Sequence, residues 1–170
     1  VCHDDDNLYV SLDCHVHEMD KFRVRLAEAD GKFHSARGGV VEVFVATGAD
    51  RATFQQYLLH ANGTTWSTLP SDDLLKILNA DFLRLGTQIT DTGYAVEAAF
   101  PLAMLNLRPD TTRIWGFNLN RGHDLYEERY DRDLSNSSWN STEGNWFATP
   151  QYFGNMVFDA DLSRFYWEVD

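Results

Sequence analysis

The chain has 170 residues, a formal net charge of −12 from 26 acidic and 14 basic residues, and an aromatic content of 14%. This length suits one domain with its own core. The acidic balance argues against nucleic acid or an anionic membrane surface as a partner, because both require a basic footprint. No apolar run approaches the roughly 20 residues that cross a bilayer, and no signal-peptide pattern opens the chain.

The first expected element is a β-hairpin. Residues 8–16 alternate apolar and polar side chains, which predicts a half-buried strand, and residues 1–3 pair with it around the turn "DDDN". In this hairpin Cys2 lies opposite residue 9, far from Cys14, which disfavours a disulfide because the Cα atoms must approach within roughly 7 Å. Since Val1 already lies in a strand, we expect a piece of a longer protein.

The rest of the chain carries short strand patterns separated by Gly, Asp, Asn and Thr. The expected strands cover residues 40–46, 53–61, 82–90, 93–100, 113–121 and 153–160. Helical signal is thin. Pro101 opens one expected turn, and Ser71 is an N-cap before the apolar run "LLKIL". The sequence therefore predicts an all-β antiparallel sandwich, jelly-roll-like, with at most one or two short helices and a single domain over residues 1–170.

Two groups near the start could bind a metal ion. Asp4, Asp5 and Asp6 place carboxylates close together, as calcium requires, although "HDDDN" is equally good turn chemistry. His15 and His17 lie two apart on a strand, hence on one face, with His3 nearby in the hairpin. These histidines suit a divalent transition metal or are polar surface residues.

No catalytic signature appears in the sequence. Glu42 and Glu97 are mid-strand carboxylates that could form a glycosidase pair. Residues 124–140 mix acids with aromatic side chains, which fits either a long solvated loop or a sugar or cation site. Asn62, Asn136 and Asn140 begin glycosylation sequons, meaningful in a eukaryotic secreted chain, and Asn62 and Asn136 could instead act as ligand amides.

Several motifs, taken in order, resemble one known family. They are "DDDNLYVSLD", "VVEVFVATG", "YLLHANGT", "TDTGYAVEAAFPLAMLNLRPDTTRIWGFNLNR", "SSWN" and "FATPQYFGNMVF". Together they resemble the carbohydrate-binding module family 9 domains of the DOMON-like superfamily over nearly the whole chain. The family's usual opening, before the first strand, is absent. The resemblance implies a β-sandwich that binds glucan or xylan chain ends, often beside calcium, as a non-catalytic module of a larger extracellular enzyme.

The resemblance also implies a binding site. In the family two tryptophans clamp a sugar while Glu, Arg and Asn bond its hydroxyls. Trp139 lies at one clamp position and Asn136 just before it could contribute an amide. Glu42 matches the mid-strand Glu that faces the sugar, and His60 and Asn62 lie where the family has Arg-x-Asn.

Two positions depart from the family pattern. Before Glu42 only Phe33 is offered in place of the second clamp tryptophan, and the Asp expected three residues before Glu42 is Gly39. Binding on a single aromatic platform is the natural hypothesis, and a domain kept only for structure or interaction with other domains of the parent chain is the alternative.

Other side chains have alternative roles. Trp115 and Phe117 are expected in the core, because they alternate with Asn118 and Asn120. Arg121 could pair with an acid or bind ligand, and Trp66 could line the site. Trp146 and Phe147 are expected to pack at the sheet edge.

Haem is a third possibility, since related DOMON-like domains hold it. Met19, Met104 or Met156 with a histidine would then be the axial ligands.

Overall fold

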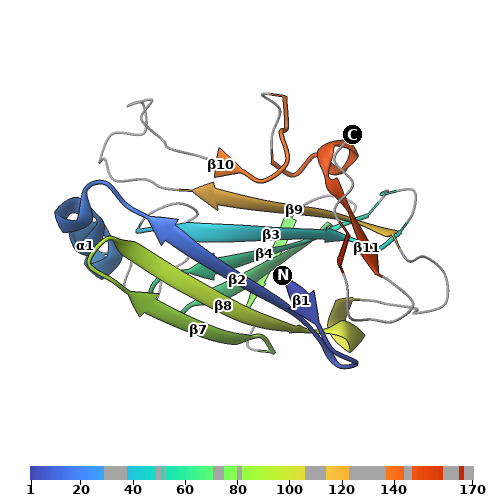
Figure 1. The fold of residues 1–170 in the computed structure, drawn as a ribbon, viewed down its shortest axis with the longest axis horizontal. Helices are drawn as coiled ribbons and strands as arrows, with labels where there is room; N and C mark the ends of the chain where they lie inside the picture. The colour runs from blue at the N-terminus through green and yellow to red at the C-terminus, as the bar shows by residue number, and fades with distance from the viewer. Residues whose placement is uncertain are drawn as a thin grey trace.

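Two antiparallel sheets lie face to face in the computed structural model, as the alternating patterns predicted (Figure 1). The structure describes residues 1–28, 38–48, 51, 53–70, 75–79, 82–105, 114–122, 137–143, 147–158 and 165–166. Each sheet buries one face against the other, and each therefore has an outer face directed away from the core. The all-β sandwich prediction is confirmed.

The smaller sheet has four strands in the order β1-β2-β8-β7. Their bounds are Cys2–His3 for β1, Asn7–His15 for β2, Gly93–Pro101 for β8 and Arg84–Ile89 for β7. The predicted N-terminal hairpin is confirmed, because Cys2 pairs with Tyr9. Cys2 is exposed, Cys14 is buried, and both are free thiols.

The larger sheet follows the order β12-β11-β9-β3-β4-β5-β6, and β10 pairs with β9 beside this path. The bounds are Val40–Ala46 (β3), Gln55–His60 (β4), Thr65–Pro70 (β5), Leu75–Asn79 (β6), Ile114–Gly122 (β9), Ser137–Ser138 (β10), Gly154–Phe158 (β11) and Phe165–Tyr166 (β12). In Figure 1 β9 and β10 lie beyond the edge of the smaller sheet, so the two sheets do not cover each other completely.

Alternation along the strands fills the core between the sheets. Every second residue of β3 points inward, and the same holds for β9, where Trp115 is 5% and Phe117 is 0% exposed. Both were expected in the core, and both are there. A smaller cluster of Phe44, Ala46 and Phe153 packs on the outer face of the larger sheet, with Phe147 against it.

The helical predictions were partly wrong. The turn after Pro101 is confirmed as the 3-10 helix η1, Leu102–Leu105, and a second 3-10 helix, η2, covers Pro150–Tyr152. The helix expected after Ser71 is wrong, because Leu75–Asn79 pairs with β5 as a strand, and that pairing overrides the local signal. Ser71 itself lies outside the described residues.

One α-helix in the described part of the chain was not predicted. This helix, α1, covers Met19–Glu28 and lies at one end of the sandwich (Figure 1). Its Phe22 is fully buried and stacks on Tyr94 of β8, with ring centroids 5.2 Å apart and planes at 5°. None of the described helices is long and apolar enough to cross a membrane.

Gly39 fits against this aromatic stack immediately before β3. Its φ is +84°, and a Cβ there would lie 2.8 Å from Tyr94 Cε1 and 2.9 Å from Phe22 Cε2. Only glycine meets both requirements, the left-handed backbone and the absent side chain. The entry of the chain into β3 is therefore fixed by a close approach between backbone and rings.

Candidate functional site

A row of side chains crosses the outer face of the larger sheet. Cross-strand partners share a face, and the register joins Ser138 to Asn120, Asn120 to Glu42, Glu42 to Leu58 and Leu58 to Trp66. We name these five residues the Glu42 row. The row brings together two predicted site residues, Glu42 and Trp66, although their strands are separated by β4.

Asn120 is the least satisfied polar residue of the Glu42 row. It is 1% exposed, yet neither its side-chain nitrogen nor its oxygen has a hydrogen-bond partner in the part of the chain that the structure describes. A buried amide without partners costs roughly 1–3 kcal/mol for each group left unsatisfied. Both polar atoms of the carboxamide are therefore buried near Glu42 without a partner among the described residues.

Glu42 is a half-buried carboxylate held by one neighbour. Gln56 Nε2 donates to its Oε2 at 2.8 Å. Burial raises the pKa of Glu42 above its ordinary value, and the hydrogen bond from Gln56 opposes part of this rise. A desolvated carboxylate next to a free amide is a strong acceptor for hydroxyl groups.

Asn118, two residues before Asn120 on the same face, has its hydrogen-bonding groups filled. Its Nδ2 donates to Ser138 Oγ at 3.1 Å and to the Asn140 carbonyl at 3.4 Å. Its Oδ1 accepts from the backbone N–H of Asn140 and of Leu119, both at 3.0 Å. Asn118 thus attaches the segment after β10 to β9, and we name this set the Asn118 network.

His60 and Asn62, the predicted Arg-x-Asn counterparts, shape the turn between β4 and β5. His60 pairs with Val40, one step along the outer face from the Glu42 row, and is 3% exposed. Its Nδ1 accepts the backbone N–H of Asn62 at 3.2 Å. The Asn62 Oδ1 accepts from the N–H and the hydroxyl of Thr64, a typical Asx turn. His60 shares the outer face with Glu42, whereas the Asn62 oxygen is already used within the turn.

Trp139 lies on the other face of the larger sheet. A Cβ at Gly154 would be 2.4 Å from Trp139 Cζ3, and Gly154 pairs with Phe117, a core residue. The Trp139 ring also meets Phe117 edge to face, with centroids 6.3 Å apart. Although Trp139 is 43% exposed, the structure does not assemble the predicted pair of Trp139 and Glu42.

The motif "SSWN" is divided between the two faces because residues alternate along an extended chain. Ser138 and Asn140 take part in the Asn118 network on the outer face, and Trp139 between them points inward. The Asn140 side-chain N–H also donates to the Tyr152 carbonyl at 2.5 Å. Although Trp139 matches the clamp tryptophan of the family in sequence, its indole does not lie beside Glu42.

Arg121 also lies on the inner face, because it pairs with the core residue Val41. Its guanidinium carbon is 5.6 Å from the centroid of the Tyr94 ring. The Nε and Nη2 atoms are buried and have no hydrogen-bond partner among the described residues. Arg121 is therefore not in the Glu42 row.

Some predicted residues cannot be placed. Phe33, Asn136 and Trp146 lie outside the described residues, as does most of the acidic stretch 124–140.

The predicted metal groups are not assembled. Within the described chain, no three His, Cys, Asp or Glu residues are arranged to hold a metal ion. Asp4 Oδ1 accepts the backbone N–H of Asp6 and of Asn7, and its Oδ2 accepts the Tyr9 hydroxyl at 2.7 Å. Asp4, Asp5 and Asp6 thus form the turn that was the alternative to a calcium site. His15 and His17 do approach each other, with ring centroids 5.1 Å apart.

The three methionines considered for haem occupy different environments. Met156 is fully buried in the main core, Met104 is 47% exposed, and Met19 packs against the core from α1.

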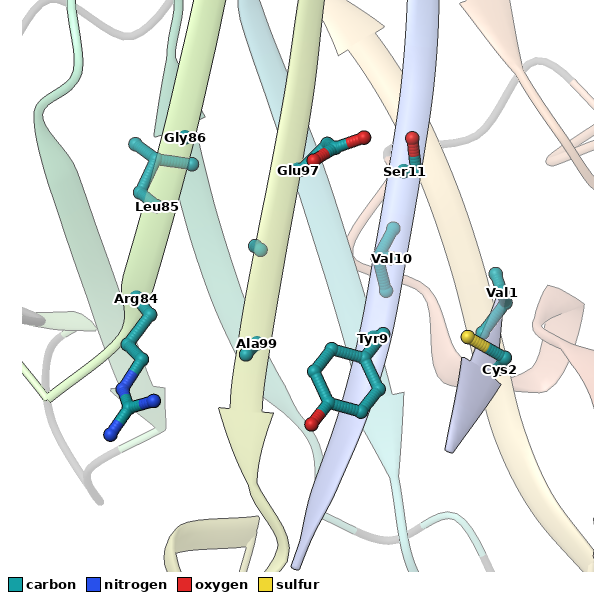
Figure 2. A pocket seen from close by; sticks show the side chains of 11 residues that line it. Val1, Cys2, Tyr9, Val10, Ser11, Arg84, Leu85, Gly86, Glu97 and Ala99 are labelled. Carbon is teal, nitrogen blue, oxygen red and sulfur yellow. The ribbon is translucent and has the colours of Figure 1, made fainter. Parts of the chain in front are cut away.

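Glu97, the other mid-strand carboxylate, lies on the opposite side of the molecule from Glu42. It projects from β8 on the outer face of the smaller sheet, with the core between the two. The suggested glycosidase pair is therefore wrong. Glu97 instead lines a pocket of about 580 Å³ formed over β1, β2, β8 and β7 (Figure 2).

Sequence reasoning missed the importance of Asn120 and Gln56. The alternation of residues 113–121 does place Asn120 opposite in direction to Phe117 and Leu119. The missing information was that β9 pairs with β3, since these strands are far apart in the chain. Only the sheet order sets Asn120 beside Glu42.

A sequence profile for the carbohydrate family 9 binding domain-like family matches residues 1–160. No curated protein matches the sequence.

Two solved structures share the fold. One is a family 9 carbohydrate binding module from Caldicellulosiruptor kristjanssonii in complex with cellotriose, with 18% identity and a TM-score of 0.53 over 90% of this chain and 69% of that one. The other is a proposed carbohydrate-binding protein from Bacteroides uniformis ATCC 8492, with 12% identity and a TM-score of 0.55 over 71% of this chain. The match spans 61% of that second protein. Because the profile covers nearly the whole sequence, the chain belongs to the carbohydrate family 9 binding domain-like family, and is a domain of carbohydrate-binding rather than catalytic type.

Proposed function

We propose that the chain is a non-catalytic module that binds the ends of glucan- or xylan-type chains on the outer face of its larger sheet. Its setting would be a larger extracellular protein, where it serves as an accessory to other domains. The observation that carries the proposal is the buried Asn120 carboxamide beside the desolvated Glu42 carboxylate, because neither its nitrogen nor its oxygen has a hydrogen-bond partner among the described residues.

The chemistry of a sugar suits this arrangement. Neighbouring hydroxyls on a pyranose each donate and accept, so one hydroxyl can donate to Glu42 while another satisfies Asn120. Gln56 holds Oε2 of Glu42, which leaves the other carboxylate oxygen for a ligand. A ligand that fills both groups recovers the cost of leaving them unpaired.

Trp66 supplies an aromatic surface at the end of the Glu42 row. It is half-buried and lies on the same face as Glu42, two strands away, which is roughly 10 Å. Stacking of a sugar ring on one indole contributes about 1 kcal/mol beyond burial. Trp66 therefore takes the platform role that the sequence resemblance gave to Trp139, with His60 flanking the row.

The test is titration of the purified chain with cellotetraose and with xylotetraose, followed by calorimetry and by amide NMR shifts. Glu42→Gln should weaken binding at the outer face of the larger sheet at least tenfold, because the amide replaces the charged acceptor. Asp91→Asn removes the same charge from a fully exposed turn residue and should leave affinity unchanged.

The outcomes separate the parts of the proposal. Equal affinity in the wild-type chain and Glu42→Gln would remove the Glu42 row from the site. Binding of neither sugar by the wild-type chain would reject the sugar class and favour a structural or interaction domain. Release of reducing ends during incubation would contradict a non-catalytic role.

A further inference from the structure

The pocket on the smaller sheet lies on the side of the molecule opposite the Glu42 row. Two registered rows form it (Figure 2). Tyr9, Ala99 and Arg84 cross β2, β8 and β7 in one row, and Ser11, Glu97 and Gly86 cross them in the next. Cys2 of β1 and the preceding Val1 close the side beside Tyr9. We name this the β8 pocket.

Small residues lower the floor of the β8 pocket at two positions, Ala99 on the central strand β8 and Gly86 on β7, whereas Glu97 of β8 stands between Ser11 and Gly86. Ala99 separates Tyr9 from Arg84, and Gly86 stands beside Glu97. Since neighbouring strands are about 4.8 Å apart, the walls formed by β2 and β7 are separated by roughly 10 Å. The pocket volume, about 580 Å³, is within the usual range for sites that hold small molecules.

The β8 pocket combines an oriented ring with polar side chains that have no hydrogen-bond or ion-pair partner among the described residues. The Tyr9 hydroxyl donates to Asp4 Oδ2 at 2.7 Å, which fixes the ring against the small-residue floor. No hydrogen bond or ion pair within the described chain involves the side chains of Glu97, Ser11 and Arg84. They offer an acceptor, a group that both donates and accepts, and a donor with several N–H groups.

We infer that the β8 pocket is a second saccharide subsite, in which a pyranose unit lies over Ala99 and Gly86 with one edge against Tyr9. Its hydroxyls donate to Glu97 and accept from Arg84, and Ser11 lies on the β2 side of Glu97, away from Arg84. A neutral ring with hydroxyls at several positions suits walls that require both donors and acceptors around a small apolar floor. This inference rests on the proposed function for the class of ligand, but on a different face of the molecule for the site.

A second subsite has a consequence for how the chain holds a polysaccharide. The Glu42 row and the β8 pocket point in opposite directions, so one short oligosaccharide cannot occupy both. Two polymer strands could be held by one module, and linked sites of this kind raise the overall avidity without any new contact.

The experiment uses the whole chain with ¹⁵N labelling, titrated separately with cellotetraose and xylotetraose. Saturable shifts are expected at the amides of Gly86, Glu97 and Ala99, and these should persist in Glu42→Gln. Gly86→Val fills the floor of the β8 pocket. A Cβ at Gly86 meets nothing closer than 3.9 Å, so the fold tolerates the change, and β8-pocket binding should weaken at least tenfold.

Gln88→Val is the matched control, because it lies on the same face of β7 one row beyond the pocket. It should retain the shifts. Shifts confined to the region of Glu42 and Asn120 would overturn the inference and leave the proposed function standing. Shifts confined to the β8 pocket would support the inference and reject the Glu42 row as the site. Shifts in neither region, or β8-pocket shifts unchanged in Gly86→Val, would also overturn the inference.

Discussion

Asn118 and Asn120 lie on the same strand, on the same face and with almost no exposure, yet their amides are treated in opposite ways. Asn118 uses both ends of its carboxamide to attach the segment after β10. Asn120 uses neither end. Local sequence, burial and secondary structure are alike at the two positions. The difference is whether the described residues supply a partner, and under the proposed function it separates a residue kept for stability from one that binds a ligand.

The largest change in stability is expected from replacing Asn118, whose carboxamide is fully hydrogen-bonded. Asn118→Leu should lower the free energy of unfolding by about 3 kcal/mol, because the N–H of Asn140 and the hydroxyl of Ser138 lose their partner in a buried setting. Urea denaturation measures this loss. A change below 0.5 kcal/mol, on the order of an ordinary surface substitution, would contradict the structural role assigned to the Asn118 network.

The same substitution at Asn120 should stabilise the fold rather than destabilise it. Asn120→Leu is expected to raise the free energy of unfolding by about 1–2 kcal/mol, because it removes a buried polar group without partners. The same change should weaken binding of cellotetraose or xylotetraose at least tenfold. Urea denaturation measures the stability and calorimetry measures the affinity of the same preparation. A destabilised Asn120→Leu variant with full affinity would contradict the contrast drawn between Asn118 and Asn120.

Trp139→Ala tests whether sugar binding depends only on the outer face of the larger sheet, since Trp139 lies on the inner face. The ring packs on Gly154 and Phe117, so its removal should cost about 1–2 kcal/mol of stability, less than a fully buried aromatic side chain. Affinity at the Glu42 row should stay within twofold of wild type. A tenfold loss of affinity in a folded variant would instead return Trp139 to the sugar site.

The smallest effect expected is the contribution of Glu42 to the pH dependence of the free energy of unfolding. Its folded pKa is raised by burial, so the folded chain binds more protons than the unfolded one between the ordinary value of 4.5 and the raised value. Stability therefore falls as pH rises through this window, and the loss is complete above it. Glu42→Gln should remove this slope and gain relative stability at pH 7, of the order of 1 kcal/mol or less. Thermal denaturation of both proteins from pH 4 to pH 8 provides the measurement.

Strand positions could be predicted where the alternation was clear. Residues 40–46, 93–100 and 114–121 proved to be strands, and Trp115 and Phe117 face the core as expected. Helix α1 escaped notice because its apolar stripe is short: Met19, Phe22 and Leu26 pack on the core at helical spacing, but Val24 between them is exposed. The local sequence of Leu75–Asn79 predicted a helix, but the segment is a strand because it pairs antiparallel with β5.

The candidate site was harder to predict because it depends on which strands are neighbours. Glu42, His60 and Trp66 could be selected from the sequence, and they do share a face. Asn120 could not, since nothing local distinguishes it from Asn118. Trp139 was selected by its motif, but the parity of a single residue sends its ring to the opposite face.

Gly39 also limits the routes by which this domain could change. The family pattern has an acid at this position, and here the Phe22 and Tyr94 rings occupy the space that any side chain would need. An Asp could return only after one of the rings became smaller and the backbone left its φ of +84°. A single substitution of Gly39 would therefore meet both the rings and a left-handed backbone, so this glycine and the aromatic stack depend on each other at the entry to β3.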